Sequence, residues 1–126
     1  PDRLFALFPN LAEMRGRSAG TMSGGEQQML TIARTLMGNP AFLLLDEPSE
    51  GLAPVIIEQM AKTILDLKRE GLTVLLSEQN LHFARVVADR ADVLIFACER
   101  EHRICFTGTM AELMTNEAVR TQYLSL

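Results

Sequence analysis

The sequence predicts an α/β fold in which helices flank a mostly parallel sheet. Two short apolar runs, residues 42–45 and 72–76, lack the alternation of half-buried strands and are typical of strands buried on both faces. A long amphipathic helical pattern separates them, as in a crossover connection between parallel strands. The length of 126 residues and the apolar content of 48% suit one globular domain with a real core.

Charge and hydropathy exclude several classes of protein. Twelve basic and sixteen acidic residues give a net charge of −4 and an isoelectric point near 5.1, which argues against a nucleic-acid surface as the main partner. The apolar runs are much shorter than the roughly eighteen residues that a membrane-spanning helix needs. The chain starts at Pro1, without an initiator Met or a secretory leader, so we expect it to be processed or cut from a longer protein.

Two helices are predicted before the first strand. Residues 3–15 form a short apolar face that Pro9 interrupts. The second helix begins after Ser23, because Glu26 follows three residues later in the pattern of a capping box. Residues 38–40, Gly-Asn-Pro, end this helix.

The remaining elements alternate between helix and strand. Pro54 opens a helix whose apolar stripe runs to Gly71. The strand at 72–76 is followed by a helix at 81–91. Two strands at 93–97 and 103–106 and short C-terminal helices complete the chain.

Whether the two cysteines can form a disulfide depends on the register of this last hairpin. If it turns at Glu101 and His102, Cys98 and Cys105 face each other, and a cross-strand disulfide can form. Two reduced, half-buried thiols are the favoured alternative. Two cysteines without histidine pairs do not indicate a zinc site, so we assign them no chemistry.

The first candidate site is the sequence Ser23-Gly24-Gly25-Glu26 at the start of a helix. A helix N-terminus offers unpaired N–H groups and the positive end of the helix dipole, and glycines let a phosphate approach these groups. A capped helix after a flexible turn explains the same residues without any ligand.

The second candidate site is the pair Asp46 and Glu47 at the end of the strand at 42–45. Ligands of open α/β sheets bind at the carboxyl ends of the strands. Asp46 can hold Mg²⁺ through its water shell, and Glu47 can orient or deprotonate a water that attacks a phosphate. An ordinary acidic turn after a strand is the alternative.

Together, and in this order, the two sites resemble the nucleotide-binding domain of ATP-binding cassette (ABC) proteins. Residues 23–28 are similar to the signature motif of that family, residues 42–47 to its Walker B strand, and residues 49–52 to the loop that follows. The resemblance implies a partial P-loop NTPase fold. It further implies part of the helical subdomain at the N-terminus and a hairpin with helices at the C-terminus.

Three further sequence stretches indicate a subclass of ABC proteins. Residues 24–30, 49–54 and 78–80 are similar to those of ATPase subunits of branched-chain amino-acid importers. The resemblance covers essentially all 126 residues as the C-terminal part of one nucleotide-binding domain. It implies that residues 1–40 belong to the helical subdomain, and that residues 41–126 hold Walker B, the switch region and the C-terminal end.

The sequence departs from the commonest ABC pattern at several positions. Glu26 replaces the usual glutamine of the signature, and its capping bond would turn the carboxylate away from nucleotide phosphates. Gln79 stands where most members carry a histidine that contacts the γ-phosphate, a substitution typical of the branched-chain subclass. His82 is the alternative switch residue, although a surface or packing role is favoured for it. Ala53 replaces the usual aspartate of the loop after Walker B.

The largest departure concerns the phosphate-binding loop. Lys62 and Lys68, the only lysines, lie in one predicted helix, and neither follows a glycine. The Gly-Lys loop that grips the β- and γ-phosphates is therefore not in this chain. We expect about the second half of a subunit, which exposes a hydrophobic edge, self-associates and does not hydrolyse ATP by itself.

The resemblance implies an ATPase that drives amino-acid import at the cytoplasmic face of the membrane. Asp46 would bind Mg²⁺, Glu47 would activate water and Gln79 would sense the γ-phosphate of ATP. The implied partners are a second ATP-binding subunit, membrane permease subunits and, indirectly, a periplasmic or extracellular solute-binding protein. The alternatives are a non-transport ABC ATPase of DNA repair, chromosome maintenance or translation, and a truncated docking module. The residues that would close over ATP held by the opposite subunit are Ser23, Gly24, Gly25 and Glu26.

Overall fold

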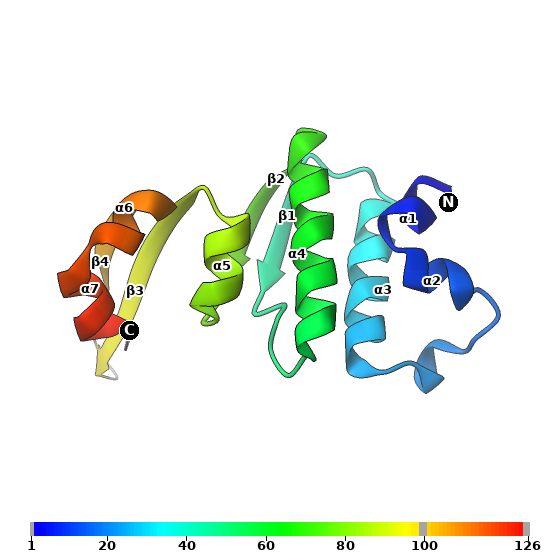
Figure 1. Ribbon diagram of the computed structural model, residues 1–126, viewed down its shortest axis with the longest axis horizontal. Coiled ribbons are helices and arrows are strands. Elements are labelled where there is room, and N and C mark those ends of the chain that lie inside the picture. Colours follow the sequence, from blue (N-terminus) through cyan, green and yellow to red (C-terminus); the bar gives the residue numbers. More distant parts are fainter. Residues whose placement is uncertain (1, 99–100, 125–126) are drawn as a thin grey trace. The chain divides into compact units, whose positions relative to one another are not determined.

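The computed structural model describes residues 2–98 and 101–124, which form two compact units divided between Phe83 and Ala84 (Figure 1). The predicted order of helices and strands is confirmed, except that the single helix expected over residues 3–15 is divided into two, the second of which begins at Pro9. The elements up to the division are α1 (Asp2–Leu7), α2 (Pro9–Glu13), the 3₁₀ turn η1 (Ala19–Thr21), α3 (Gly24–Leu36), β1 (Phe42–Asp46), α4 (Pro54–Arg69), β2 (Thr73–Ser77) and the first residues of α5 (Leu81–Val87).

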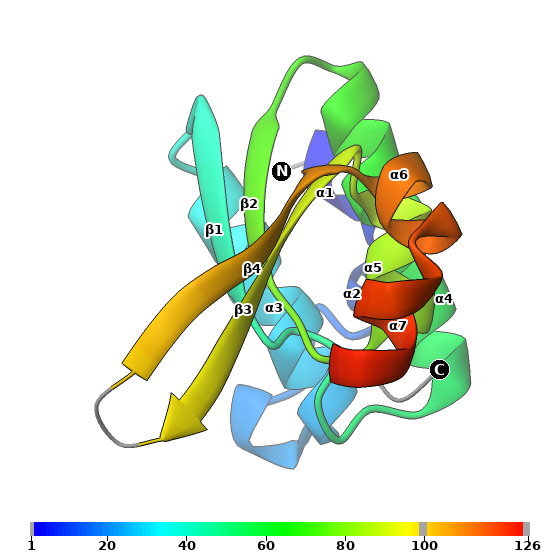
Figure 2. The same cartoon turned by 90° about the vertical axis from the view of Figure 1, so that its left-hand side faces the viewer.

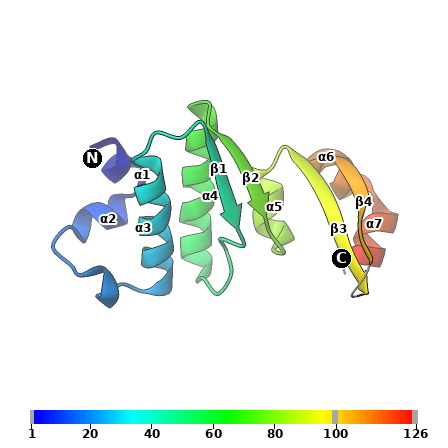
Figure 3. The same ribbon diagram turned by 180° about the vertical axis from the view of Figure 1, so that it is seen from behind.

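The first unit is built on a parallel pair of strands. β1 and β2 are hydrogen-bonded in register from Phe42↔Thr73 to Asp46↔Ser77, and α4 connects them. α4 lies in front of the strands in Figure 1 and behind them in Figure 3, so it covers one face of the pair. Because the strands are parallel, their carboxyl ends meet at one edge of the sheet.

The prediction that both faces of these strands are buried is wrong for the residues that the structure describes. Leu43 and Leu45, on one face of β1, are only 3% and 6% exposed, whereas Phe42 and Leu44 on the other face are 52% and 63% exposed. Leu75 of β2 is 55% exposed. An apolar run without alternation suits burial on both faces, but here α4 covers only one of them (Figure 3).

The helices of the first unit pack on α4 through apolar side chains and two long-range hydrogen bonds. Asn10 Nδ2 donates to Gln59 Oε1 at 2.8 Å, and Thr63 Oγ1 donates to the carbonyl oxygen of Leu7 at 3.3 Å. Both bonds tie the start of the chain to α4. The buried side chains of this core include Phe8, Leu11, Met29, Ile32, Ala33, Leu43, Leu45, Met60, Ala61, Ile64 and Leu67.

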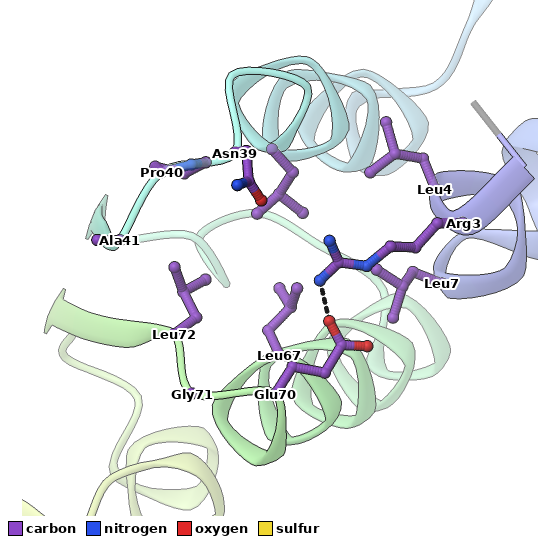
Figure 4. A pocket seen from close by; sticks show the side chains of 11 residues that line it. Arg3, Leu4, Leu7, Asn39, Pro40, Ala41, Leu67, Glu70, Gly71 and Leu72 are labelled. Atoms are coloured by element: carbon purple, nitrogen blue, oxygen red, sulfur yellow. Dashed lines mark hydrogen bonds and ion pairs between the residues drawn. The ribbon is translucent and has the colours of Figure 1, made fainter.

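A pocket of about 270 Å³ lies at the amino ends of the two strands (Figure 4). Leu67 and Leu72 line it, and an ion pair between Arg3 and Glu70 crosses it. None of the site residues expected from the sequence lines this pocket. It therefore lies at the opposite ends of the strands from the candidate site.

The second unit is an antiparallel hairpin followed by two short helices. Figure 2 shows β3 (Arg90–Cys98) and β4 (Glu101–Thr109) as a long twisted ribbon that leads into α6 (Met110–Thr115) and α7 (Glu117–Tyr123). The helix expected at 81–91 ends at Val87, because Arg90 already pairs with Thr109. Among the residues that the structure describes, no helix is long and apolar enough to cross a membrane.

The register of the hairpin differs from the expected one. Glu101 pairs with Cys98, so the predicted turn at Glu101 and His102 is wrong. Because Cys98 pairs with Glu101, it does not face Cys105. Cys105 lies at one of two small register shifts in the hairpin, opposite the step from Val93 to the next residue. It is a free, half-buried thiol whose S–H donates to the carbonyl oxygen of Val93 at 3.3 Å, while the Cys98 side chain lies outside the described residues.

Candidate functional site

The start of α3 has the capping box that the sequence predicts. Ser23 has extended backbone angles, and its hydroxyl oxygen accepts a hydrogen bond from the backbone N–H of Glu26 at 3.4 Å. In return, the Ser23 N–H donates to Glu26 Oε2 at 2.7 Å. The Glu26 carboxylate is therefore turned back onto its own helix start, as expected.

These bonds keep the Glu26 side chain charged. The backbone N–H and then the hydroxyl of Ser23 lower the pKa of the Glu26 carboxyl below its ordinary value, and the positive charge of Arg17 acts in the same direction. An ionised carboxylate at this position also interacts favourably with the positive end of the helix dipole.

The two glycines of the motif have different surroundings. Gly25 is buried, and a Cβ there would lie 2.9 Å from Cγ2 of Ile56, so a side chain at this position would require Ile56 or the start of α4 to shift. Gly24 is exposed, and a Cβ there would meet nothing within 4 Å. Packing therefore explains Gly25, whereas Gly24 leaves open backbone of the kind that an approaching anion needs.

The carboxyl end of β1 carries Asp46 and Glu47. The N–H of Glu47 donates to the carbonyl oxygen of Ser77 at 2.8 Å, which continues the pairing with β2 by one step. The backbone of Glu47 then turns into the left-handed region, with a φ of 42°, which is uncommon for a residue other than glycine. Its carbonyl oxygen accepts from the N–H of Glu50 at 3.1 Å, so hydrogen bonds hold this turn on both sides.

Two of the expected catalytic residues lie in direct contact at this edge. Gln79, which follows β2, donates from Nε2 to Glu47 Oε1 at 2.5 Å. Glu47 is half-buried and Gln79 is exposed. His82 is exposed near the start of α5, and in the described part of the chain it has no hydrogen bond to Glu47.

Asp46 is the one exposed carboxylate at the end of β1 itself. It lies on the open face of the strand, with Leu44, rather than on the face that α4 covers. Within residues 2–98 and 101–124, no three His, Cys, Asp or Glu side chains gather to hold a metal ion by themselves. Mg²⁺ is commonly held by one or two carboxylates together with phosphates and water, so the donor chemistry of Asp46 fits a nucleotide-bound Mg²⁺.

The structure leaves the two candidate sites separate. The start of α3 and the carboxyl ends of the strands lie at the same end of the first unit in Figures 1 and 3. No hydrogen bond or ion pair of the described residues joins residues 23–26 to Asp46, Glu47 or Gln79.

Sequence reasoning missed the most connected side chain at the strand ends. The Glu78 Oε1 atom accepts hydrogen bonds from the Ser49 hydroxyl at 2.9 Å and from the backbone N–H groups of Gln79 and Asn80 at 3.1 and 2.9 Å. Its Oε2 atom accepts from the N–H of Ser49 at 3.3 Å. An acidic residue beside Gln79 was visible in the sequence, but its partner Ser49 lies 29 positions away.

Comparison with known proteins gives consistent results. Residues 6–50 match the family described as ABC transporter. The chain is 54% identical over 123 residues to the high-affinity branched-chain amino acid transport ATP-binding protein BraG of Pseudomonas aeruginosa, covering 98% of this chain and 51% of that protein. It is 39% identical over 117 residues to the probable branched-chain amino acid transport ATP-binding protein LivF of Archaeoglobus fulgidus, covering 92% and 48%.

A solved structure supports the same assignment. The ADP conformation of an ATP-binding cassette of an ABC transporter superposes with a TM-score of 0.79 at 26% identity, covering 98% of this chain and 48% of that chain. The chain spans about half the length of the curated relatives it matches. Over nearly all of its length the chain is similar to ABC transporter ATP-binding proteins, and residues 6–50 match the ABC transporter family.

Proposed function

We propose that this chain is part of the ATP-hydrolysing subunit of an ABC importer for branched-chain or related amino acids. Residues 1–40 would then belong to the helical subdomain, and residues 41–126 would hold Walker B, the switch region and the C-terminal end. The observation that carries the proposal is the 2.5 Å hydrogen bond from Gln79 to Glu47 at the edge where parallel strands end. The 54% identity to a branched-chain amino acid transport ATP-binding protein supports the choice of solute.

The geometry supports hydrolysis by positioning rather than by covalent chemistry. Glu47 accepts a proton from the attacking water and orients it. The Gln79 amide has two N–H donors, so one holds Glu47 while the other is available to an oxygen of the γ-phosphate. Asp46 would hold Mg²⁺, which neutralises charge on the phosphates when bound.

In this proposal the start of α3 forms one side of a composite ATP site, whose other side belongs to a second subunit. The open backbone at Gly24 and the positive end of the helix dipole would close over ATP held by a second ATP-binding subunit, identical or related. Ser23, Gly25 and Glu26 would fix the shape of this helix start, with the Glu26 charge directed back to Ser23. Permease subunits at the cytoplasmic face of the membrane, and through them a solute-binding protein, complete the proposed assembly.

Measurements of amino-acid uptake test the proposal. Cells that lack the complete subunit are expected to lose uptake of leucine, isoleucine and valine, and the wild-type subunit is expected to restore it. A Glu47→Gln subunit is expected to assemble without restoring uptake. Unchanged uptake of all three amino acids in the deleted strain would contradict the proposed solute class.

The 126-residue chain by itself is expected to behave differently from a complete subunit. It lacks a Gly-Lys phosphate loop, so we expect weak ATP binding and no hydrolysis. Phe42, Leu44 and Leu75 leave an apolar sheet face open, so we also expect self-association. ATP hydrolysis by the purified chain would contradict the expected lack of activity. Light scattering that shows only monomer at high concentration would contradict the expected self-association.

A further inference from the structure

The Glu78 carboxylate connects the two loops that carry the proposed catalytic residues. It is half-buried and accepts four hydrogen bonds, two from Ser49 after β1 and two from the backbone of Gln79 and Asn80 after β2. Hydrogen bonds to an ionised acceptor are shorter and stronger than those between neutral groups. This single side chain therefore holds the two loops in a fixed relation.

The connection extends directly to Glu47 and Gln79. Ser49 lies two residues after Glu47, at 5% exposure, and Pro48 between them is fully buried. Gln79 follows Glu78 immediately, and its own backbone N–H is one of the four donors. Moving the Ser49 loop away from Glu78 would therefore move Glu47 away from the Gln79 amide.

The strained backbone of Glu47 needs support from its surroundings. Its φ of 42° is disfavoured for a side chain of this kind and persists only where the surroundings hold it. The bond from the N–H of Glu50 to Glu47 fixes the turn locally, and the bond from the N–H of Glu47 to Ser77 joins the start of the turn to β2. The link from Ser49 to Glu78 joins the far side of the same turn to the loop after β2.

We propose that Glu78 is a positioning residue for ATP hydrolysis, which sets the distance between the Glu47 carboxylate and the Gln79 amide without touching the nucleotide. The inference rests on the proposed function. A residue of this kind acts on the turnover step, because the reacting groups are all present but their alignment is lost without it.

Variants of the complete subunit test this role. Glu78→Ala is expected to lower kcat about tenfold or more, while KM for ATP changes less than about twofold. Glu78→Gln keeps one acceptor oxygen but places an amide N–H₂ against a donor of Ser49, so its kcat is expected to fall about threefold. Glu58→Gln, which changes an exposed acid on α4, is the control and is expected to match wild type.

A double-variant cycle tests whether Ser49 and Glu78 act through one shared contact. Ser49→Ala removes the hydroxyl that bonds to Glu78, so Ser49→Ala combined with Glu78→Ala is expected to be no slower than Glu78→Ala alone. Additive losses would overturn the proposal. In Glu78→Gln, hydrogen exchange of the Gln79 and Asn80 amides is expected to be faster than in wild type, because both lose a charged acceptor.

The outcomes distinguish this inference from the proposed function. If Glu78→Ala does not fold, the kcat of Glu78→Gln tests the positioning role instead. A kcat of Glu78→Gln equal to that of Glu58→Gln overturns this role. An active wild-type subunit with unaffected Glu78 variants overturns only this inference. A wild-type subunit that does not hydrolyse ATP overturns the proposed function and the positioning role with it.

Discussion

The start of α3 and the carboxyl ends of β1 and β2 both present polar groups, but different kinds of bonds hold them. At α3, Ser23 and Glu26 bond to each other across three residues. At the strand ends, Gln79 reaches Glu47 across 32 positions. The first region is therefore a local structure of one helix start, whereas the second exists only once the parallel pair of strands has formed.

This difference predicts how each region responds to substitution. Besides any loss of the proposed contact with ATP, changes at the start of α3 are expected to alter the stability of a helix, because its bonds are local and its surroundings are largely exposed. Changes at the strand ends are expected to alter turnover, because the bonds there align groups from two loops. Substitutions in each region can break or sharpen this contrast.

The largest effect is expected at Glu47. In the complete subunit, Glu47→Gln retains the shape of the side chain but cannot accept a proton, so kcat for ATP hydrolysis is expected to fall about 10²–10⁴-fold. The free energy of unfolding is expected to stay close to that of wild type, since Gln can still accept a bond from the Gln79 amide. Steady-state hydrolysis and urea unfolding measure the two quantities, with Glu58→Gln as the matched surface control.

A smaller loss of turnover is expected at Gln79. Gln79→Ala removes the donor to Glu47 Oε1, and kcat is expected to fall about 10–100-fold. His82→Ala, which changes an exposed side chain without a bond to Glu47, is expected to change kcat less than about twofold. A larger loss in His82→Ala than in Gln79→Ala would give the switch role to His82 instead.

The two regions also differ in how far the sequence predicts them. Ser23 and Glu26 lie within one turn, so the capping box follows from residue types and spacing alone, and it is confirmed. The order of elements follows equally well from apolar periodicity, and the predicted helix start at Pro54 is confirmed.

Long-range pairing limits the rest of the prediction. The contact between Glu78 and Ser49 depends on which strands become neighbours, and no local pattern contains that information. The hairpin shows the same limit, because β3 and β4 pair in a different register from the expected one, with Cys98 opposite Glu101 and not opposite Cys105. The open face of β1 was missed because an apolar run reports its composition and not how many layers cover it.

The two glycines of the signature offer a contrast within the α3 region itself. Gly25→Ala is expected to lower the free energy of unfolding by about 1–2 kcal/mol, because the new methyl group overlaps Cγ2 of Ile56. Gly24→Ala is expected to change it by less than about 0.5 kcal/mol, because nothing lies within 4 Å. Urea unfolding of the complete subunit measures both.

A second substitution sharpens this test. If the overlap with Ile56 is the cause, Gly25→Ala combined with Ile56→Ala is expected to be no less stable than Ile56→Ala alone. Equal stability of Gly24→Ala and Gly25→Ala would show that Ile56 moves aside without cost. The packing explanation for Gly25 would then be wrong.

The smallest effect is expected at Glu26, as a change in the pH dependence of stability. The bonds from Ser23 lower the folded-state pKa of Glu26 below its ordinary value of 4.5. A carboxyl with a lowered folded-state pKa contributes stability that is fully present above the unfolded value and is lost as pH falls through the folded value. The melting temperature of Glu26→Gln is therefore expected to lie below that of wild type at pH 7, and the difference is expected to vanish well below pH 4.5.

Glu112 is the matched case, because it forms the same capping box with Thr109 at the start of α6 and the same bonds lower its pKa. Glu112→Gln is expected to show the same direction of pH dependence as Glu26→Gln. Agreement between the two variants would attribute the effect to the capping box and not to the signature motif around Glu26. A pH dependence confined to Glu26→Gln would instead show that the region around α3 holds this carboxylate by more than its local bonds, and the contrast with the strand ends would weaken.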